Sequence, residues 1–202
     1  MILKFNKMKI LKLLTIFVFA GNCLFSQNTV VSDSIELEIN GVKKKFAYTD
    51  MAAMYIETGI EDLKSAKYDY AIEDFKTALS FTPDNSDIYY YLGLTYYFIE
   101  DYEQSILFIS RAIELNSDNI AYYNQRGISY SNYNMYDQAL ADFEKMLELD
   151  PNSAEANLNI GSIYLLTEDY QTACQYINKA ASSNNEKALY LQQKYCTEEN
   201  SE

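Results

Sequence analysis

The 202-residue chain contains no histidine and no tryptophan, and it has only two prolines and six glycines. Without histidine it lacks the side chain that most often serves as a general base or a metal ligand. Adjacent acids such as Glu61–Asp62 and Glu73–Asp74 diverge on a helix and do not converge on one substrate. No phosphate-binding glycine loop is present. The sequence therefore favours a protein that is not an enzyme, and it predicts no catalytic residue, metal site or cofactor.

The few glycines are evenly spaced. Gly59, Gly93, Gly127 and Gly161 follow one another at intervals of 34 residues. A period of this length is typical of one helix–turn–helix unit, and stacked units form a solenoid. The spacing thus predicts four units, which cover residues 52–85, 86–119, 120–153 and 154–185.

Other positions keep the same register. Position 17 is tyrosine in every unit, position 20 is alanine or serine, and both prolines, Pro83 and Pro151, fall at position 32. Proline cannot continue a helix, so it ends the second helix of a unit. The pattern resembles the tetratricopeptide repeat (TPR) family over about residues 52–185. This resemblance implies an all-α, right-handed superhelical solenoid of four repeats.

The 20 tyrosines and 10 phenylalanines have two interpretations. Glycine at position 8 and alanine or serine at position 20 let two helices approach closely, and aromatic rings then fill the space around the contact. The alternative is an aromatic box for a ligand. We favour core packing.

The beginning of the chain resembles a secretory signal peptide over residues 1–26. An apolar run from Leu13 to about Phe25 is shorter than the ~20 residues that span a bilayer, and cleavage is expected after Ser26. A lipid anchor on Cys23 is the alternative. The preceding basic segment carries Lys4, Lys7, Lys9 and Lys12. The preference for lysine over arginine suggests an AT-rich bacterial genome. We expect an exported protein, in the periplasm, at the outer-membrane periphery or secreted, with no transmembrane span after cleavage.

Removal of residues 1–26 leaves 12 basic and 29 acidic residues, a net charge of −17. Such a surface repels nucleic-acid phosphates and anionic lipids. The expected partner is therefore a neutral or basic protein or peptide segment, and not a nucleic acid. The alternative is that the acidic residues only keep the solenoid soluble.

Residues 27–50 form an N-terminal segment in which a β-hairpin is predicted over residues 34–48, because Asn40–Gly41 separates two alternating runs. The turn would pair Glu38 with Lys43 and Glu36 with Lys45. The alternative is a flexible linker, since a lone hairpin is marginal in water.

A fifth, unpaired helix is predicted over residues 186–196, where it would cap the last repeat. Cys174 and Cys196 are expected to form a disulfide in an oxidising compartment, and two free thiols packed in the core are the alternative. The acidic tail, residues 197–202, is expected to be disordered.

The resemblance also implies a binding surface. In TPR proteins the first helix of each repeat lines a concave groove, chiefly through positions 2, 5, 9, 12 and 13. The family's clamp for a C-terminal carboxylate needs lysine, arginine and asparagine there, but Ile56, Ile60 and Tyr90 occur instead. We expect a monomer whose groove binds an apolar protein segment. A structural subunit that uses other faces is the alternative. The predicted groove positions are Ile56, Ile60, Leu63, Tyr90, Leu94, Tyr97, Asn124, Ile128, Ser131, Leu158, Ser162 and Leu165.

Overall fold

The computed structural model describes residues 33–39 and 42–196. Every helix and strand described below belongs to one compact unit within Ser34–Glu202. The predicted signal peptide and the predicted disordered tail lie outside the described residues. Within the described ranges, no helix combines the length and the apolar character needed to cross a membrane.

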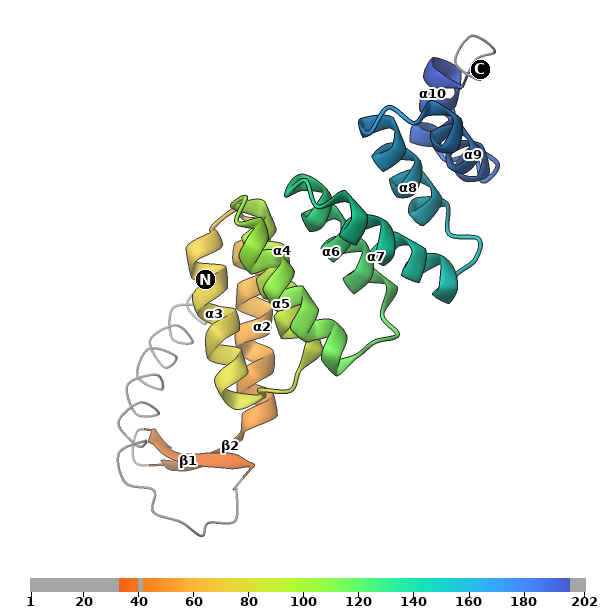
Figure 1. The fold of residues 1–202 in the computed structure, drawn as a ribbon. Coiled ribbons are helices and arrows are strands. Elements are labelled where there is room, and N and C mark those ends of the chain that lie inside the picture. The colour runs from red at the N-terminus through yellow and green to blue at the C-terminus, as the bar shows by residue number, and fades with distance from the viewer. Residues whose placement is uncertain (1–32, 40–41, 197–202) are drawn as a thin grey trace. The chain divides into compact units, whose positions relative to one another are not determined.

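The predicted hairpin is confirmed. Strands β1 (Ser34–Ile39) and β2 (Val42–Ala47) pair antiparallel, and Glu36 lies opposite Lys45 as the Asn-Gly turn predicts. The ion pair described within the hairpin is diagonal, with Lys43 Nζ 3.7 Å from Glu36 Oε1. Both side chains are too exposed for this pair to add much stability. Strand β2 leads directly into the first helix (Figure 1).

Nine helices follow in the described part of the chain. Eight of them form four helical hairpins, α2–α3, α4–α5, α6–α7 and α8–α9, and α10 packs against α9 as the predicted cap (Figure 1). Their bounds are α2 (Tyr48–Lys64), α3 (Tyr68–Phe81), α4 (Ser86–Phe98), α5 (Tyr102–Leu115), α6 (Ile120–Asn132), α7 (Tyr136–Leu149), α8 (Ala154–Leu166), α9 (Tyr170–Ala181) and α10 (Glu186–Tyr195). The predicted all-α solenoid is confirmed.

Helix α2 begins at Tyr48, four residues before the start of the predicted first unit at Ala52. The hairpin ends at Ala47, and no proline or glycine separates it from the helix. Asp50 lies in the first turn, where a negative charge is favourable. The helix therefore extends back to the end of the strand.

The two helices of each helical hairpin approach closely at the repeat glycine. A Cβ atom added to Gly59 would lie 2.7 Å from Phe75 Cε1, and one added to Gly93 would lie 2.3 Å from Ile109 Cγ1. Such distances are shorter than any ordinary carbon–carbon contact, so only glycine permits this helix separation. The residues that face the glycines, Phe75 and Ile109 among them, are buried.

The tyrosines differ in burial. Tyr55, Tyr122 and Tyr123 are buried, which agrees with core packing, most of the others are half-buried, and a few, such as Tyr70 and Tyr133, are exposed. Aromatic content therefore serves the core only in part, and the exposed tyrosines need a separate explanation.

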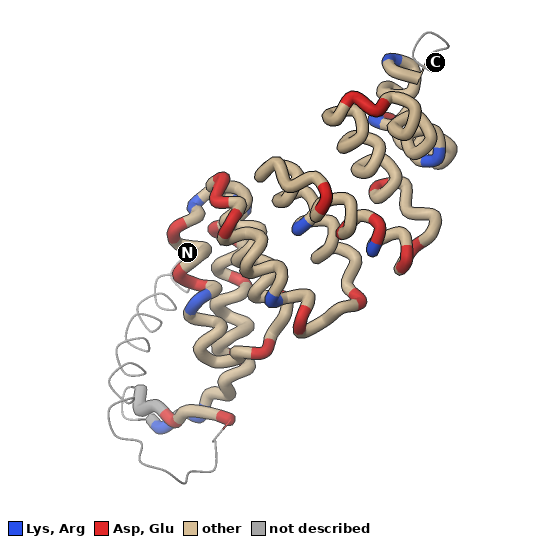
Figure 2. Tube along the Cα trace, in the orientation of Figure 1, with Lys and Arg blue, Asp and Glu red and all other residues tan. Residues whose placement is uncertain are grey.

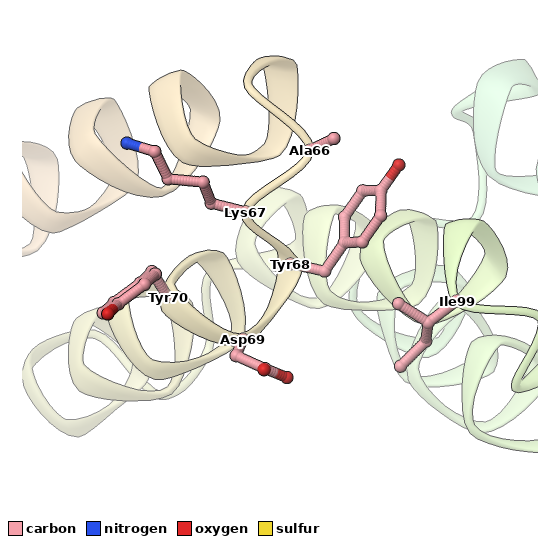
Figure 3. A pocket seen from close by; sticks show the side chains of 6 residues that line it. All are labelled: Ala66, Lys67, Tyr68, Asp69, Tyr70 and Ile99. Atoms are coloured by element: carbon pink, nitrogen blue, oxygen red, sulfur yellow. The ribbon is translucent and has the colours of Figure 1, made fainter.

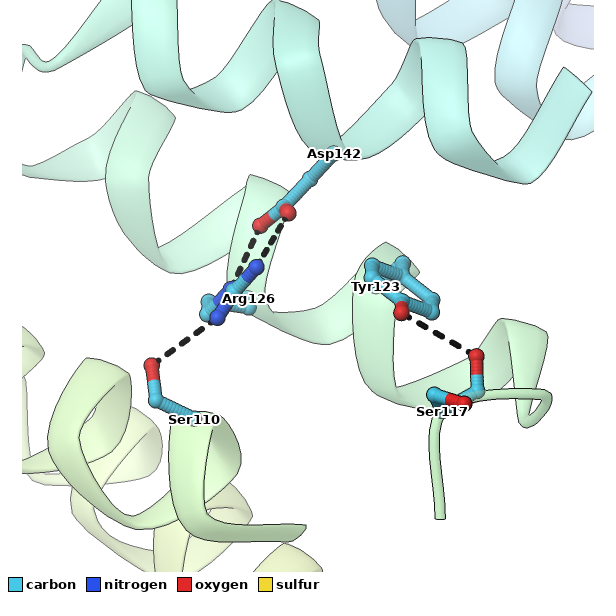
Figure 4. Close-up of polar contacts among 5 residues, drawn as sticks. All are labelled: Ser110, Ser117, Tyr123, Arg126 and Asp142. Atoms are coloured by element: carbon cyan, nitrogen blue, oxygen red, sulfur yellow. Dashed lines mark hydrogen bonds and ion pairs between the residues drawn. The ribbon is translucent and has the colours of Figure 1, made fainter. Parts of the chain in front are cut away.

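A polar cluster joins the second and third units. The Arg126 guanidinium donates to both carboxylate oxygens of Asp142, at 2.8 Å and 2.6 Å, and to Ser110 Oγ at 3.0 Å (Figure 4). Burial raises the pKa of the Asp142 carboxyl, and the Arg126 charge opposes this shift. Nearby, Tyr123 donates its hydroxyl to the Ser117 carbonyl at 3.0 Å. These bonds connect helices α5, α6 and α7.

The C-terminal cap brings two cysteines close together. Cys174 of α9 and Cys196, directly after α10, have Cα atoms 5.4 Å apart, within the range that a disulfide requires. Ala188 of α10 is buried against Ala180 and Ala181 of α9. The disulfide between these two cysteines stays a prediction.

Candidate protein-binding groove

The predicted groove positions all lie on the first helix of a hairpin, namely α2, α4, α6 and α8. These first helices form a row, because α2 contacts α4 and α4 contacts α6. Eleven of the twelve positions are partly exposed, as a binding surface requires. Leu158 differs: it is only 6% exposed and packs with Ala180, Ala181 and Ala188. The cap helix α10 therefore covers Leu158, the first predicted groove residue of the last unit.

An aromatic cluster joins α4 to α6. The Tyr90 ring stacks on Tyr122, with centroids 5.2 Å apart, and Tyr91 lies 5.6 Å from Tyr90. The Tyr122 hydroxyl donates to Asp87 Oδ1 at 2.6 Å and to Ser86 Oγ at 3.1 Å. Burial, and then the Asp87 hydrogen bond, raises the pKa of Tyr122. Tyr90 thus lies on a rigid aromatic base and presents the rest of its ring outward.

An amide network joins α6 to α8. Asn124 donates from Nδ2 to Glu155 Oε1 at 2.8 Å, and Asn159 donates to Asn124 Oδ1 at 2.9 Å. Burial raises the pKa of Tyr90, with smaller contributions from Tyr91 and from the charge of Glu155. Glu155 therefore acts electrostatically on both the Asn124 network and the Tyr90 cluster. A partner that uses Asn124 must share or replace these bonds.

The serines contribute less than the sequence suggested. Ser162 donates its hydroxyl to the Leu158 carbonyl at 2.7 Å, one turn back in the same helix. A hydroxyl engaged in this way has little left to offer a ligand. The groove positions therefore rely on leucine, isoleucine, tyrosine and the Asn124 amide.

Two carboxylates at position 2 were not among the predicted site residues. Asp87 and Glu155 are exposed, and neutral donors, Tyr122 and Asn124, hold one oxygen of each. Neither belongs to an ion pair within the described residues. Both lie one turn before a predicted groove position, and position 2 already belongs to the family's groove pattern, so applying that pattern in full would have found them.

Acidic positions recur along all the helical hairpins, and basic ones are fewer (Figure 2). Among the residues that the structure describes, no group of three or more histidine, cysteine, aspartate or glutamate side chains could hold a metal ion. The arrangement offers apolar contact and oriented hydrogen-bond acceptors. Such a surface is suited to holding a peptide.

Comparison with known proteins identifies the repeat. Models described as tetratricopeptide repeat match residues 86–119, 120–153 and 143–175, and one described as TPR repeat matches residues 63–97. No curated protein sequence matches the chain.

Solved structures with the same fold include three that are informative. YrrB, described as a TPR protein with an unusual peptide-binding site, is 28% identical with a TM-score of 0.64, over 70% of this chain and 74% of that one. MamA is 25% identical with a TM-score of 0.63, and the match covers 69% of this chain and 81% of that one. The second TPR domain of human RPAP3, solved with the HSP70 peptide SGPTIEEVD, is 23% identical with a TM-score of 0.55, and the match covers 58% of this chain and 98% of that one. This likeness shows the fold alone. The chain belongs to the tetratricopeptide repeat family.

Proposed function

We propose that this protein is a non-enzymatic scaffold that binds a protein segment along the row of first helices α2, α4, α6 and α8. The observation that carries the proposal is the partly exposed Tyr90 ring on its buried aromatic base, among exposed apolar neighbours on the same helices. Rigid aromatic side chains are the commonest energetic centres of protein interfaces. The likeness to YrrB, whose title names a peptide-binding site, supports peptide binding here.

The bound segment is apolar and carries at least one basic side chain. Asp87 lies three residues before Tyr90 on α4, and the charge of Glu155 on α8 acts on Tyr90. Each carboxylate has one oxygen held in place by a neutral donor. Carboxylates oriented in this way favour a lysine or arginine on the partner. An acidic tail such as SGPTIEEVD would instead meet like charge, and Ile56 and Ile60 offer it no cationic clamp.

We place this activity in the bacterial envelope or outside the cell. The layout of residues 1–26 supports export, and so does the predicted pairing of Cys174 with Cys196, since disulfides persist in oxidising compartments. In this setting the mature chain acts as a monomer that recruits an envelope protein.

The test is a capture experiment with the mature chain from Gln27 onward as bait, in solubilised envelope extract. A second bait carries Tyr90→Ala, Leu94→Ala and Tyr97→Ala, and its helix content is checked by circular dichroism. A control bait carries Leu107→Ala and Tyr190→Ala, which remove exposed apolar side chains away from the first helices.

We expect a protein that the native and control baits hold and the groove bait loses. Equal retention by all three baits would move the binding site off the groove. A light-scattering mass of the mature chain adds an independent check, since a defined oligomer would favour the alternative of a structural subunit.

A further inference from the structure

Exposed apolar side chains gather at the turn between the two helices of each hairpin. The structure describes nine exposed large hydrophobic side chains, and six of them, from 38% to 63% exposed, lie at this turn or within three residues of it. Patches of this kind on a protein surface commonly mark interaction sites. We call these residues the turn edge: Tyr70, Phe98, Ile99, Tyr133, Leu166 and Tyr170. None of them is among the twelve groove residues, but Phe98 and Leu166 stand at position 13 of the repeat, where the groove borders the turn edge.

A hollow opens in the turn edge where the first two units meet. It has a volume of about 270 Å³ and is lined by Ala66, Lys67, Tyr68, Asp69, Tyr70 and Ile99. Tyr68 and Ile99 extend toward each other from neighbouring units, while Tyr70 and Lys67 point to the other side (Figure 3). The volume lies below the ~300–1,000 Å³ of small-molecule pockets and is suited to one large side chain.

Aromatic contacts make this region rigid. The Tyr68 ring stacks on Phe98 with centroids 6.0 Å apart, and Phe98 meets Tyr97 edge-on at 5.7 Å. Tyr97 in turn contacts Tyr102 at 5.8 Å. The hollow is therefore formed in the unbound protein and does not have to be built when a partner arrives, which lowers the entropic cost of binding.

The hollow has two charged lining residues, Lys67 and Asp69. Lys67 is held by Asp62 at 3.1 Å, whereas Asp69 is exposed and belongs to no ion pair within the described residues, so its negative charge is left to act on a partner. A second copy of this chain, or an anionic lipid surface, would bring like charge against this edge. A basic protein segment would meet complementary charge.

We propose that the turn edge is a second docking surface, for a basic protein segment that inserts one large apolar side chain between Tyr68 and Ile99. A lysine or arginine side chain beside that anchor lies against Asp69. The anchor residues Tyr68 and Ile99 lie outside the groove positions, so the scaffold can hold two segments or one segment at two points.

The test uses a phage-displayed library of random peptides, panned in parallel on four forms of the mature chain. These are the native protein, a groove variant with Tyr90→Ala and Leu94→Ala that keeps Tyr97, an edge variant with Tyr70→Ser and Ile99→Ser, and a matched control with Leu189→Ser and Tyr190→Ser. The control removes the same kinds of exposed side chain from α10.

We expect a set of peptides that the native, groove and control forms select and that the edge variant loses. These peptides should share a large apolar residue flanked by lysine or arginine. For one such peptide, fluorescence anisotropy should show about tenfold or greater weakening with the edge variant. Asp69→Asn should weaken binding several-fold and reduce its salt dependence.

Three outcomes would overturn the proposal. The first is that no selected peptide depends on the edge variant, and the second is that edge-dependent peptides carry no basic residue. The third is self-association or liposome flotation of the native chain that the edge variant abolishes, which would identify a second copy or a lipid surface as the occupant. Loss of peptides by the groove variant alone bears on the groove and leaves these results separable.

Discussion

Replacement of Gly93 by alanine tests whether the repeat glycines are required by helix contact. The added Cβ would lie 2.3 Å from Ile109 Cγ1 and 3.0 Å from the Ser105 carbonyl oxygen. Because Ser105 presents its backbone, rotation of a side chain cannot remove that contact, and α4 and α5 must move apart. Alanine is the better helix former by about 1 kcal/mol. Overpacking of a tight core typically costs about 1–3 kcal/mol.

The cost of overpacking should exceed the gain in helix propensity. The contact involves both a side chain and a backbone atom, so we expect a cost near the top of that range and a net loss of about 1–2 kcal/mol in the free energy of unfolding. Urea denaturation of the mature chain, followed by circular dichroism, measures it. A helix that gained only its intrinsic propensity would instead become more stable.

A double-mutant cycle separates the clash from other causes. Ile109→Ala alone should cost about 2–5 kcal/mol because it leaves a cavity in the core. In that background the Cγ1 contact is gone, so Gly93→Ala should cost less than it does in the native protein, with a coupling energy of about 1 kcal/mol. An unchanged cost in both backgrounds, or a stabilised Gly93→Ala protein, would refute the reasoning.

Three further predictions concern the cap, the core and the turns. Replacing Cys174 and Cys196 by serine opens a loop of 22 residues and should lower stability by about 3 kcal/mol, while two alkylatable thiols in the exported protein would contradict the pairing. Burial raises the pKa of Tyr55 from 10.0 to about 12, so its contribution to stability is complete below pH 10 and lost between pH 10 and 12. Tyr90 and Tyr122 also have raised pKa values, so Tyr55→Phe should reduce the alkaline loss in a pH series of melts without abolishing it, and an unchanged profile would reject the assignment. Glu168 has φ 62°, so Glu168→Gly should raise the melting temperature slightly, whereas Glu144→Gly inside α7 should lower it.

The fold could be predicted because its constraints are local and repeated. The spacing of Gly59, Gly93, Gly127 and Gly161 reports contacts that only a glycine allows, and the same contact recurs in each hairpin. The Asn-Gly pair in the sequence predicted the register in which the two strands are found. Periodic packing leaves a periodic sequence, and such a sequence can be read directly.

The turns were less predictable. Position 15 of every unit adopts a left-handed conformation, at Ala66, Glu100, Asn134 and Glu168. Only Asn134 belongs to the residue types that favour this region, so composition gave no signal. The tight turn imposes the conformation whatever the side chain, since the two helices must close on the glycine contact.

The groove residues were predicted from their positions in the family's repeat. Long-range contacts decide which of them are accessible and how their neighbours are oriented. Leu158 is covered because α10 packs beside it, which no pattern within its own unit reveals. Asp87 and Glu155 acquire their orientation from Tyr122 and Asn124, in a neighbouring unit. The exposure of the turn-edge residues could not be predicted, because the sequence does not distinguish an exposed apolar residue from a buried one.

The most direct test of the central claim is amide hydrogen exchange on the mature chain with and without a captured partner segment. Binding along the groove predicts slower exchange in the first helices α4 and α6, which carry Tyr90 and Asn124, with little change in α5 and α7. Slower exchange confined to α5, α7 and α9, with α4 and α6 unchanged, would contradict the groove as the binding surface.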